Sequence, residues 1–418
     1  MTLARFCSCA MLLLAAMSCG PSRKLDAPVV ESGLDVLVAE DFALLKGKRV
    51  GVVTNHTAID RQGRHIADLL HEAPGVTLSK LFAPEHGIRG TAEAGAHISS
   101  EVDTKTGVPV MSLYGPTKKP TPEMLRDLDV LVFDIQDVGA RFYTYISTMA
   151  LAMEAAAEQG LPFVVLDRPN PIGGAIVEGP VLEPENRSFV GIHPIALRHG
   201  MTVGELARMF NEEGWLAGGI RADLTVVTMK NWRRAMPFAE TGLPWVKPSP
   251  NIVSPTTAFL YPGIGLLEAT NVAEGRGTPT PFEVCGAPWI DSGRLLATLR
   301  THSFPGLECD TTSFVPMDMP GMATDPKYEG ERCKGLRLRV SDPTVFRVVD
   351  FGMYLLAAVR DMHADRFVIR EPGMRLMTGS TAVTAAMMKG DKPENIIASW
   401  QKDLQRFLEL RKKYLLYD

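Results

Sequence analysis

The sequence predicts an α/β protein of two domains, the first built on a parallel sheet with helices on both faces. The chain has 418 residues, more than one hydrophobic core usually serves, so two domains are expected. Hydrophobic residues make up 45% of the chain and charged residues 22%, which suits a large buried core. Along the first half, apolar strand-like segments alternate with helical segments, as they do in parallel sheets covered on both sides.

Predicted strands and helices alternate regularly along the first half of the chain. Short apolar runs bounded by polar residues predict strands, and apolar residues at helical spacing predict helices. The long alanine-rich segment that begins at Arg141 is followed by Gly160, a residue typical of helix ends. The expected strands are residues 49–55, 77–82, 108–114, 130–135 and 162–166, and the expected helices are 65–73, 122–127 and 141–159.

After Pro171 the alternation becomes looser. Residues 243–281 are rich in Pro, Gly, Asn and Thr and show little periodicity, which indicates a loop region near a domain boundary. We therefore place the two domains at residues 35–249 and 250–418. The other expected helices are 202–213, 293–301, 349–362 and 394–414, and the other expected strands are 224–229, 306–316 and 335–340.

The first residues have the features of an export signal. A short charged start is followed by an apolar run to Met17, and Cys19 stands just after a small-residue cleavage site. We predict a signal peptide at 1–18, acylation of Cys19 and a lipid-anchored tether at 19–34, which places the protein in the cell envelope, on the periplasmic or extracytoplasmic side. An ordinary secretory signal or an uncleaved anchor is the alternative, although the apolar run is short for a membrane span.

Three cysteines remain in the predicted mature body: Cys285, Cys309 and Cys333. They contain no pair separated by two residues, and the histidines lack ligand spacing, so no metal site is predicted. One disulfide and three buried thiols are both consistent with this number.

Several classes of partner and cofactor do not fit the sequence. A formal net charge of -4 with scattered lysines and arginines argues against nucleic acid, and membrane contact is expected through the lipid anchor only. The glycine motifs of dinucleotide and phosphate binding, the serine-hydrolase elbow and the zinc-protease helix motif are absent, so no cofactor is predicted. Carboxylates, amides, arginines and aromatic residues remain, and these groups bind and cleave carbohydrates.

Four of the predicted strands end in polar residues. These ends are residues 54–57, 83–87, 134–139 and 167–171. In an open parallel sheet, ligands bind beyond the carboxyl ends of the strands. The sequence therefore predicts one shared polar cleft at this edge.

Glu85 is the first candidate for the proton donor of a glycosidase. It follows an apolar strand and Phe82, and partial burial there favours the protonated form that a general acid needs. The alternative is a structural role as a helix cap or as the partner of His86 or Arg89.

Asp134 and Asp137 are the candidates for the second catalytic group. Glycoside cleavage usually needs a second carboxylate to stabilise the oxocarbenium-like centre. Either aspartate could instead bond to the backbone at the strand-to-helix turn or pair with Arg141.

Longer blocks around these residues resemble the exo-β-N-acetylmuramidase (NamZ) family. The resemblance extends over nearly the whole chain after the tether. It implies a Rossmann-like N-terminal domain, a C-terminal α/β domain and an active-site cleft between them. It also implies release of N-acetylmuramic acid from non-reducing ends of peptidoglycan fragments, with a catalytic glutamate that maps to Glu85. The blocks are residues 54–57, 82–90, 134–145, 167–171, 178–180, 248–252, 261–263 and 274–278.

The implied substrate gives roles to other polar residues. The lactyl carboxylate of N-acetylmuramic acid suits an arginine, the hydroxyl and acetamido groups suit Asn and His, and tyrosines pack against the apolar face of a sugar. Structural ion pairs for the arginines and core positions for the tyrosines are the alternatives. The acetamido carbonyl acting as internal nucleophile also stays open. The candidate substrate-binding residues are Asn55, His56, His86, Arg141, Tyr143, Tyr145, Arg168, Asn170, Asn251, Asn271 and Arg276.

Two other functions stay open at this stage. One is a hexosaminidase with a different sugar preference, such as N-acetylglucosamine. The other is a non-catalytic lipoprotein that binds wall sugars, since a two-domain body with a polar cleft suits capture as well as catalysis.

Overall fold

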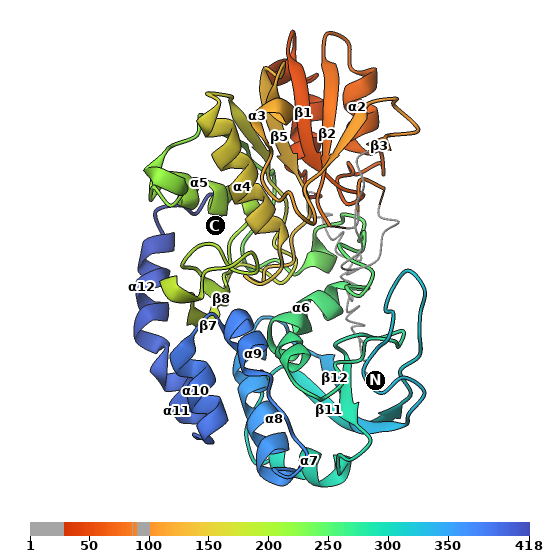
Figure 1. Cartoon of the computed structure of the whole chain (residues 1–418), viewed down its shortest axis with the longest axis vertical. Coiled ribbons are helices and arrows are strands. Elements are labelled where there is room, and N and C mark those ends of the chain that lie inside the picture. Colours follow the sequence, from red (N-terminus) through yellow and green to blue (C-terminus); the bar gives the residue numbers. More distant parts are fainter. Residues whose placement is uncertain (1–28, 86, 90–100) are drawn as a thin grey trace, which may run out of the picture.

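The computed structural model describes residues 29–85, 87–89 and 101–418, and of Glu101 only the backbone. Two α/β domains follow one another along the chain, the first at the top of Figure 1 and the second at the bottom. The predicted fold class is confirmed.

Among the described residues, seven strands form the sheet of the first domain. They lie in the order β3-β4-β2-β1-β5-β6-β9. All neighbouring pairs are parallel except β3 with β4, so the predicted parallel sheet is confirmed and carries one short antiparallel edge strand. The strands are β1 (Arg49–Thr54), β2 (Thr77–Ala83), β3 (Glu101–Val102), β4 (Pro109–Ser112), β5 (Val130–Asp134), β6 (Phe163–Leu166) and β9 (Leu224–Val227).

Side chains of each central strand alternate between two apolar layers. In β5, Val130 and Val132 join one core cluster, whereas Leu131 and Phe133 join the other. A strand buried on both faces therefore appears in the sequence as a continuous apolar run. The first layer is covered by α1 (Gly33–Ala39) and α2 (Ile66–Glu72), and the second by α3 (Pro122–Leu125), α4 (Tyr145–Glu158) and α5 (Val203–Glu212).

The second domain is built around a small antiparallel sheet with the strand order β10-β12-β11. Its core is continuous with the second apolar layer of the first domain. An antiparallel pair of β7 (Glu178–Val181) and β8 (Ala196–Arg198) lies between the two sheets (Figure 1). The elements of the second domain are α6 (Pro255–Ile264), η5 (Gly265–Ala269), β10 (Val284–Ala287), α7 (Ser292–Leu299), β11 (Leu307–Phe314), β12 (Cys333–Val340), α8 (Val348–Met362), α9 (Glu371–Thr378), α10 (Thr381–Lys389), α11 (Pro393–Ser399) and α12 (Gln401–Arg411).

Helix α6 lies inside the segment that the sequence predicts as loop, and that prediction is wrong. Eight of its ten residues are buried, so it has no polar face and shows no helical periodicity. Gly263 allows α6 to contact α8 closely, because a Cβ there would lie 2.1 Å from the carbonyl oxygen of Val348. The glycine that weakens the helical pattern is thus what the packing requires.

Other helices also differ from the sequence prediction. Helix α4 begins at Tyr145 rather than Arg141, and residues 141–144 form a turn. The predicted terminal helix is divided into α11 and α12 at Trp400, whose side chain is buried in the core. Helices α9 and α10 are not predicted, because they are short and only a few of their residues are buried.

The chain's last residues return to the first domain. Helix α12 runs along the second domain, and the C-terminus lies beside α5 (Figure 1). The Tyr417 hydroxyl donates to Asp167 at 2.5 Å, and the Arg234 backbone N–H donates to the Asp418 carbonyl at 2.6 Å. These bonds hold the C-terminal tail against the end of β6.

The first residues that the structure describes pack against the first domain. Val30 is buried beside Met229, Trp232 and Met236. Residues 29–34, which the sequence analysis assigns to the tether, therefore pack on the first domain. The two valines at their start form too short an apolar run to predict this packing. The predicted signal peptide and Cys19 lie outside the described residues. Among the helices that the structure describes, none combines the length and apolarity needed to cross a membrane.

Candidate active site

A cavity of about 140 Å³ lies where the strand ends of the first domain meet α6. Parallel pairing brings the strand ends to one edge, since Thr54 lies opposite Asp134 and Ala83 lies opposite Ser112. Aromatic side chains and a few polar groups form the wall, a combination suited to a sugar ring. The lining residues are Glu85, Phe142, Tyr143, Thr144, Ser249, Asn251, Ile252, Tyr261, Arg276 and Phe282.

Glu85 enters this cavity from the end of β2. The hydroxyl of Tyr114, at the end of β4, lies 3.0 Å from Glu85 Oε1 and donates a hydrogen bond to it. Burial and the nearby Glu85 raise the pKa of Tyr114 to about 12, so the phenol keeps its proton at physiological pH. The sequence places Tyr114 at a strand end but does not single it out; its position beside the strand of Glu85 is the signal that could have found it.

Three tyrosines form a packed wall next to Glu85. Tyr143 meets Tyr145 edge to face at 4.9 Å, and meets Tyr261 in the same way at 6.0 Å. Burial, followed by the charge of Glu85, raises the pKa of Tyr145, whose hydroxyl donates to the Pro248 carbonyl at 2.7 Å. Tyr143 lines the cavity, whereas Tyr145 supports it from behind.

Asn251 lines the cavity, and its side-chain amide is held by one hydrogen bond. Its Nδ2 donates to the Met322 carbonyl at 2.6 Å, which fixes the amide. Its buried Oδ1 receives no hydrogen bond from any residue the structure describes. This amide oxygen can accept a hydrogen bond from an N–H or O–H group of a bound molecule.

Arg276 is held at the cavity by two carboxylates. Its Nη2 lies 2.8 Å from Glu268, its Nε lies 3.4 Å from Glu274, and its guanidinium carbon lies 5.4 Å from the ring centroid of Phe282. Burial opposes the charge, but Glu268 and Glu274 raise the pKa of Arg276 above its ordinary value. The cavity therefore contains a fixed cation in its wall.

Arg141 has a different environment, although the sequence groups it with Arg276. Its guanidinium is buried and donates to four backbone carbonyls, those of Pro180, Ile195, Met377 and Thr378, at 2.7–3.1 Å. These bonds join the β7–β8 hairpin to the end of α9, and they leave Arg141 outside the cavity wall.

Arg168 and Asp134 form a buried ion pair with each other. Arg168 Nη2 lies 2.9 Å from one Asp134 oxygen, and Arg168 Nε bonds to the other. Arg168 Nη2 also donates to the Ile59 carbonyl at 3.1 Å. Both oxygens of Asp134 thus face a guanidinium, and neither residue lines the cavity of Glu85.

Asp137, like Asp134, does not line the cavity of Glu85. Burial raises the pKa of Tyr145, and the charges of Glu85 and Asp137 add to this rise. Asp137 Oδ2 accepts from the Gly139 N–H at 2.7 Å and lies 3.6 Å from Nε2 of the buried His199. Its buried Oδ1 receives no hydrogen bond from the described residues. The sequence prediction includes Asp137 but not His199.

The loop after β1 is shaped by its own side chains. Asn55 Oδ1 accepts from the Thr57 N–H at 3.0 Å and from the Thr57 hydroxyl at 2.6 Å, and the Gln136 N–H donates to that hydroxyl at 3.0 Å. His56 Nε2 lies 2.7 Å from the Lys247 carbonyl. Asn55 and His56 therefore organise the strand ends behind the cavity wall.

Two other predicted ligand residues lie outside the cavity. Asn170 donates to the Met201 carbonyl at 3.0 Å and accepts from the Ile172 N–H at 3.2 Å. Asn271 bonds to the backbone of Arg366 and Val368 in the second domain, each at 2.8 Å. His86 lies outside the described residues.

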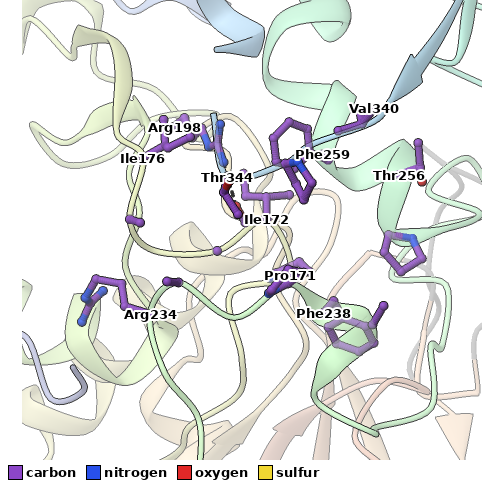
Figure 2. A pocket seen from close by; sticks show the side chains of 17 residues that line it. Pro171, Ile172, Ile176, Arg198, Arg234, Phe238, Thr256, Phe259, Val340 and Thr344 are labelled. Atoms are coloured by element: carbon purple, nitrogen blue, oxygen red, sulfur yellow. Dashed lines mark hydrogen bonds between the residues drawn. The ribbon is translucent and has the colours of Figure 1, made fainter. Parts of the chain in front are cut away.

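A second cavity, of about 180 Å³ and mostly apolar, lies between the two domains. Figure 2 shows Ile172, Phe238 and Phe259 among the side chains around it. Phe259 and Tyr261 are two residues apart on α6, so the two cavities lie on different faces of this helix. The two arginines in this wall are already paired with carboxylates, Arg198 with Glu178 and Arg234 with Glu205.

Among the described residues, no group of three or more His, Cys, Asp or Glu side chains is placed to hold a metal ion. Cys285, Cys309 and Cys333 are free thiols. Burial raises the pKa of Cys309 and Cys333 to about 12. The interpretation as three thiols, rather than a disulfide, is confirmed.

Comparison with known families accounts for nearly the whole described chain. Residues 50–256 match the family described as "Exo-beta-N-acetylmuramidase NamZ, N-terminal", and residues 259–417 match "Exo-beta-N-acetylmuramidase NamZ, C-terminal". The chain belongs to the NamZ family. The two matched segments meet beside the start of α6, next to the cavity of Glu85.

Individual NamZ-like proteins support this membership over the full length. The peptidoglycan beta-N-acetylmuramidase NamZ of Bacillus subtilis (strain 168) is 48% identical over 408 residues, which cover 97% of this chain and 96% of that protein. Two crystal structures of DUF1343 family proteins from Bacteroides fragilis are also similar. The first has 39% identity and a TM-score of 0.86 over 93% of this chain and 99% of its own. The second has 34% identity and a TM-score of 0.75 over 94% and 99%.

Proposed function

We propose that this protein is an exo-β-N-acetylmuramidase that releases N-acetylmuramic acid from non-reducing ends of peptidoglycan fragments, with Glu85 as general acid. Family membership supports the activity. The observation that carries the residue assignment is the position of Glu85 in the wall of a cavity that also contains Arg276, Asn251 and Tyr143. A carboxyl group there can protonate the leaving oxygen of a glycoside.

Arg276 is the proposed receptor for the lactyl carboxylate. Of the three arginines that the sequence nominates, Arg276 lines the cavity, whereas Arg141 and Arg168 are engaged elsewhere. A guanidinium offers paired N–H donors to a carboxylate, and the two supporting glutamates hold it in place. N-acetylglucosamine lacks the lactyl group, so this contact would favour the muramic sugar.

Asp137 is the proposed second catalytic group. Asp134 is less suited to this role, because its oxygens already face the guanidinium of Arg168. Asp137 has an oxygen without a hydrogen-bond donor among the described residues, and its charge acts on the tyrosine that Glu85 also influences. It would stabilise the oxocarbenium-like centre, directly or by orienting the acetamido group of the substrate.

The test of the function is a comparison of two chromogenic glycosides with the body from residue 22 to 418. Release from the N-acetylmuramic acid glycoside, with far slower release from the N-acetylglucosamine analogue, is expected. Preferential release of N-acetylglucosamine would identify a different hexosaminidase. Saturable sugar binding with no product from either glycoside would identify a binding lipoprotein instead.

We also propose that the protein is anchored in the cell envelope by acylation of Cys19. The apolar run before Cys19 and the cleavage-site pattern support this location. Metabolic labelling with a palmitate analogue in a bacterial host should label the full chain and leave the Cys19→Ser variant unlabelled. Equal labelling of both chains would contradict the anchor, and release of an unlabelled wild-type protein would indicate an ordinary secretory signal.

A further inference from the structure

We propose that Tyr114 is a positioning residue for the reaction, which holds Glu85 Oε1 and so fixes the orientation of the carboxyl group in the cavity wall. This inference rests on the proposed role of Glu85 as general acid. The Tyr114 hydroxyl lies 3.0 Å from Glu85 Oε1 and donates to it. A donor fixed at one oxygen restricts rotation of the carboxyl group and so sets how the group faces the cavity.

The backbone fixes this contact from both sides. Strands β2 and β4 pair in parallel register, with Ala83 opposite Ser112, and the Leu113 N–H donates to the Ala83 carbonyl at 2.8 Å. The same register carried two residues further sets Glu85 beside Tyr114. Ser112 holds the second residue, because its hydroxyl lies 3.1 Å from the Tyr114 carbonyl and 3.3 Å from the Tyr114 nitrogen. Both partners therefore leave neighbouring strands at a fixed separation.

Tyr114 remains a donor throughout the reaction. Burial and Glu85 raise its pKa to about 12, so its hydroxyl does not ionise when Glu85 gives up its proton. The bond strengthens when Glu85 becomes a carboxylate, since hydrogen bonds to a charged acceptor are stronger than those to a neutral one. Tyr114 thus stabilises the carboxylate that Glu85 becomes after proton transfer, and it also orients the carboxyl group before the transfer.

Other ionisable groups share this environment. Tyr145 and Tyr261 are buried, and the charges of Glu85 and Asp137 both raise their pKa values after burial does. Tyr143 and Arg276 line the same cavity. Substitution of Tyr114 leaves these groups in place, so a change in pH dependence would report on the bond to Glu85.

The test is the pH dependence of kcat/KM for the N-acetylmuramic acid glycoside in the Tyr114→Phe variant. Without the donor, Glu85 holds its proton to higher pH, so the basic limb should move upward by about one pH unit. Incorporation of 3-fluorotyrosine at position 114, a stronger donor, should move the limb in the opposite direction. At the plateau, Tyr114→Phe should lower kcat more than it raises KM.

A matched control is available in the second domain. The Tyr414 hydroxyl bonds to Glu213 beside α12, away from the cavity, so Tyr414→Phe removes the same kind of bond and should leave the pH profile unchanged. Activity that falls equally at every pH in Tyr114→Phe, with the basic limb unmoved, would mean a structural role only and would overturn the proposal.

A direct titration separates this inference from the proposed function. Carbon-13 NMR of selectively labelled glutamate carboxyls, with the Glu85 signal assigned by Glu85→Gln, follows the carboxyl without turnover. A higher titration midpoint for Glu85 in Tyr114→Phe supports the inference even if the wild-type chain releases no sugar, an outcome that would refute only the proposed function. An unchanged midpoint overturns the inference whatever the activity.

Discussion

Two regions at the same edge of the sheet hold carboxylates in opposite ways. At the end of β2, Glu85 lines a cavity and accepts a hydrogen bond from the neutral hydroxyl of Tyr114. At the ends of β5 and β6, Asp134 is enclosed by Arg168, and Asp167 is fully buried among hydrogen-bond donors. The sequence presents all three as polar residues after apolar strands. A carboxylate at a strand end is therefore expected to lie near a functional site. The hydrogen-bond donors around it decide whether it has a catalytic or a structural role.

The comparison is tested most strongly by Glu85→Gln. Loss of the proton donor should lower kcat/KM by roughly 10²–10⁴-fold, while the free energy of unfolding changes little. Steady-state kinetics and urea denaturation of the same preparation measure both quantities. Near-normal turnover in this variant would remove Glu85 from the mechanism.

Asp134→Asn should show the reverse behaviour. It leaves the buried guanidinium of Arg168 without its counter-charge, and breaking such a pair costs about 3–5 kcal/mol. The midpoint of urea unfolding should fall accordingly, with KM of the remaining folded enzyme close to the wild-type value. If the variant were stable but inactive, Asp134 rather than Asp137 would be the better second catalytic group.

Asp167 should make stability depend on pH. Burial raises its pKa to about 7, although Tyr417, Gly204 and Thr202 donate to it and oppose the shift. The unfolded chain releases this proton at lower pH than the folded protein does. The free energy of unfolding should therefore decline between about pH 4 and pH 7. The expected decline is about 2 kcal/mol, because relaxation of the folded protein around the charged carboxylate reduces the effect.

The measurement is urea unfolding at several pH values for the wild type and Asp167→Asn. The variant should lack this part of the slope, whatever its absolute stability. Parallel curves for the two proteins would show that Asp167 keeps its ordinary ionisation in the folded state.

Arg276→Lys should give the smallest effect. It tests whether Arg276 binds substrate, unlike Arg141 and Arg168. Lysine keeps the charge but loses the paired donors, so KM for the muramic glycoside should rise about 10-fold, or about 1.4 kcal/mol. Activity on the N-acetylglucosamine analogue should change less. Arg339→Lys, on the exposed side of β12, is the control. An equal loss on both sugars would argue against recognition of the lactyl group.

The first domain was more predictable than the second for a physical reason. Strands β1, β5 and β6 are buried on both faces, so continuous apolar runs identify them directly. Helix α6 is also buried all round, but a short buried helix with Pro262 and Gly263 has no periodic pattern to recognise. Its burial depends on α8, which is far away in the sequence.

The candidate site divides in the same way. Glu85 and Arg276 were nominated from local sequence and do line one cavity. Arg141 is nominated on equal grounds, yet its guanidinium donates to carbonyls of the β7–β8 hairpin and of Met377 and Thr378, and the last two lie more than two hundred residues away. Tyr114 was passed over, because only the pairing of β2 with β4 shows that it faces Glu85.

The sequence by itself determined the fold class, the edge of the sheet where chemistry is concentrated and the family resemblance. These properties depend on local runs of residue types, which are visible along the chain. The tertiary structure decided which of the nominated arginines lines the cavity, which aspartate forms an ion pair and which tyrosine bonds to Glu85. Each of these depends on donors and acceptors brought together by strand pairing and domain packing, and a buried polar group takes its role from the partners that surround it.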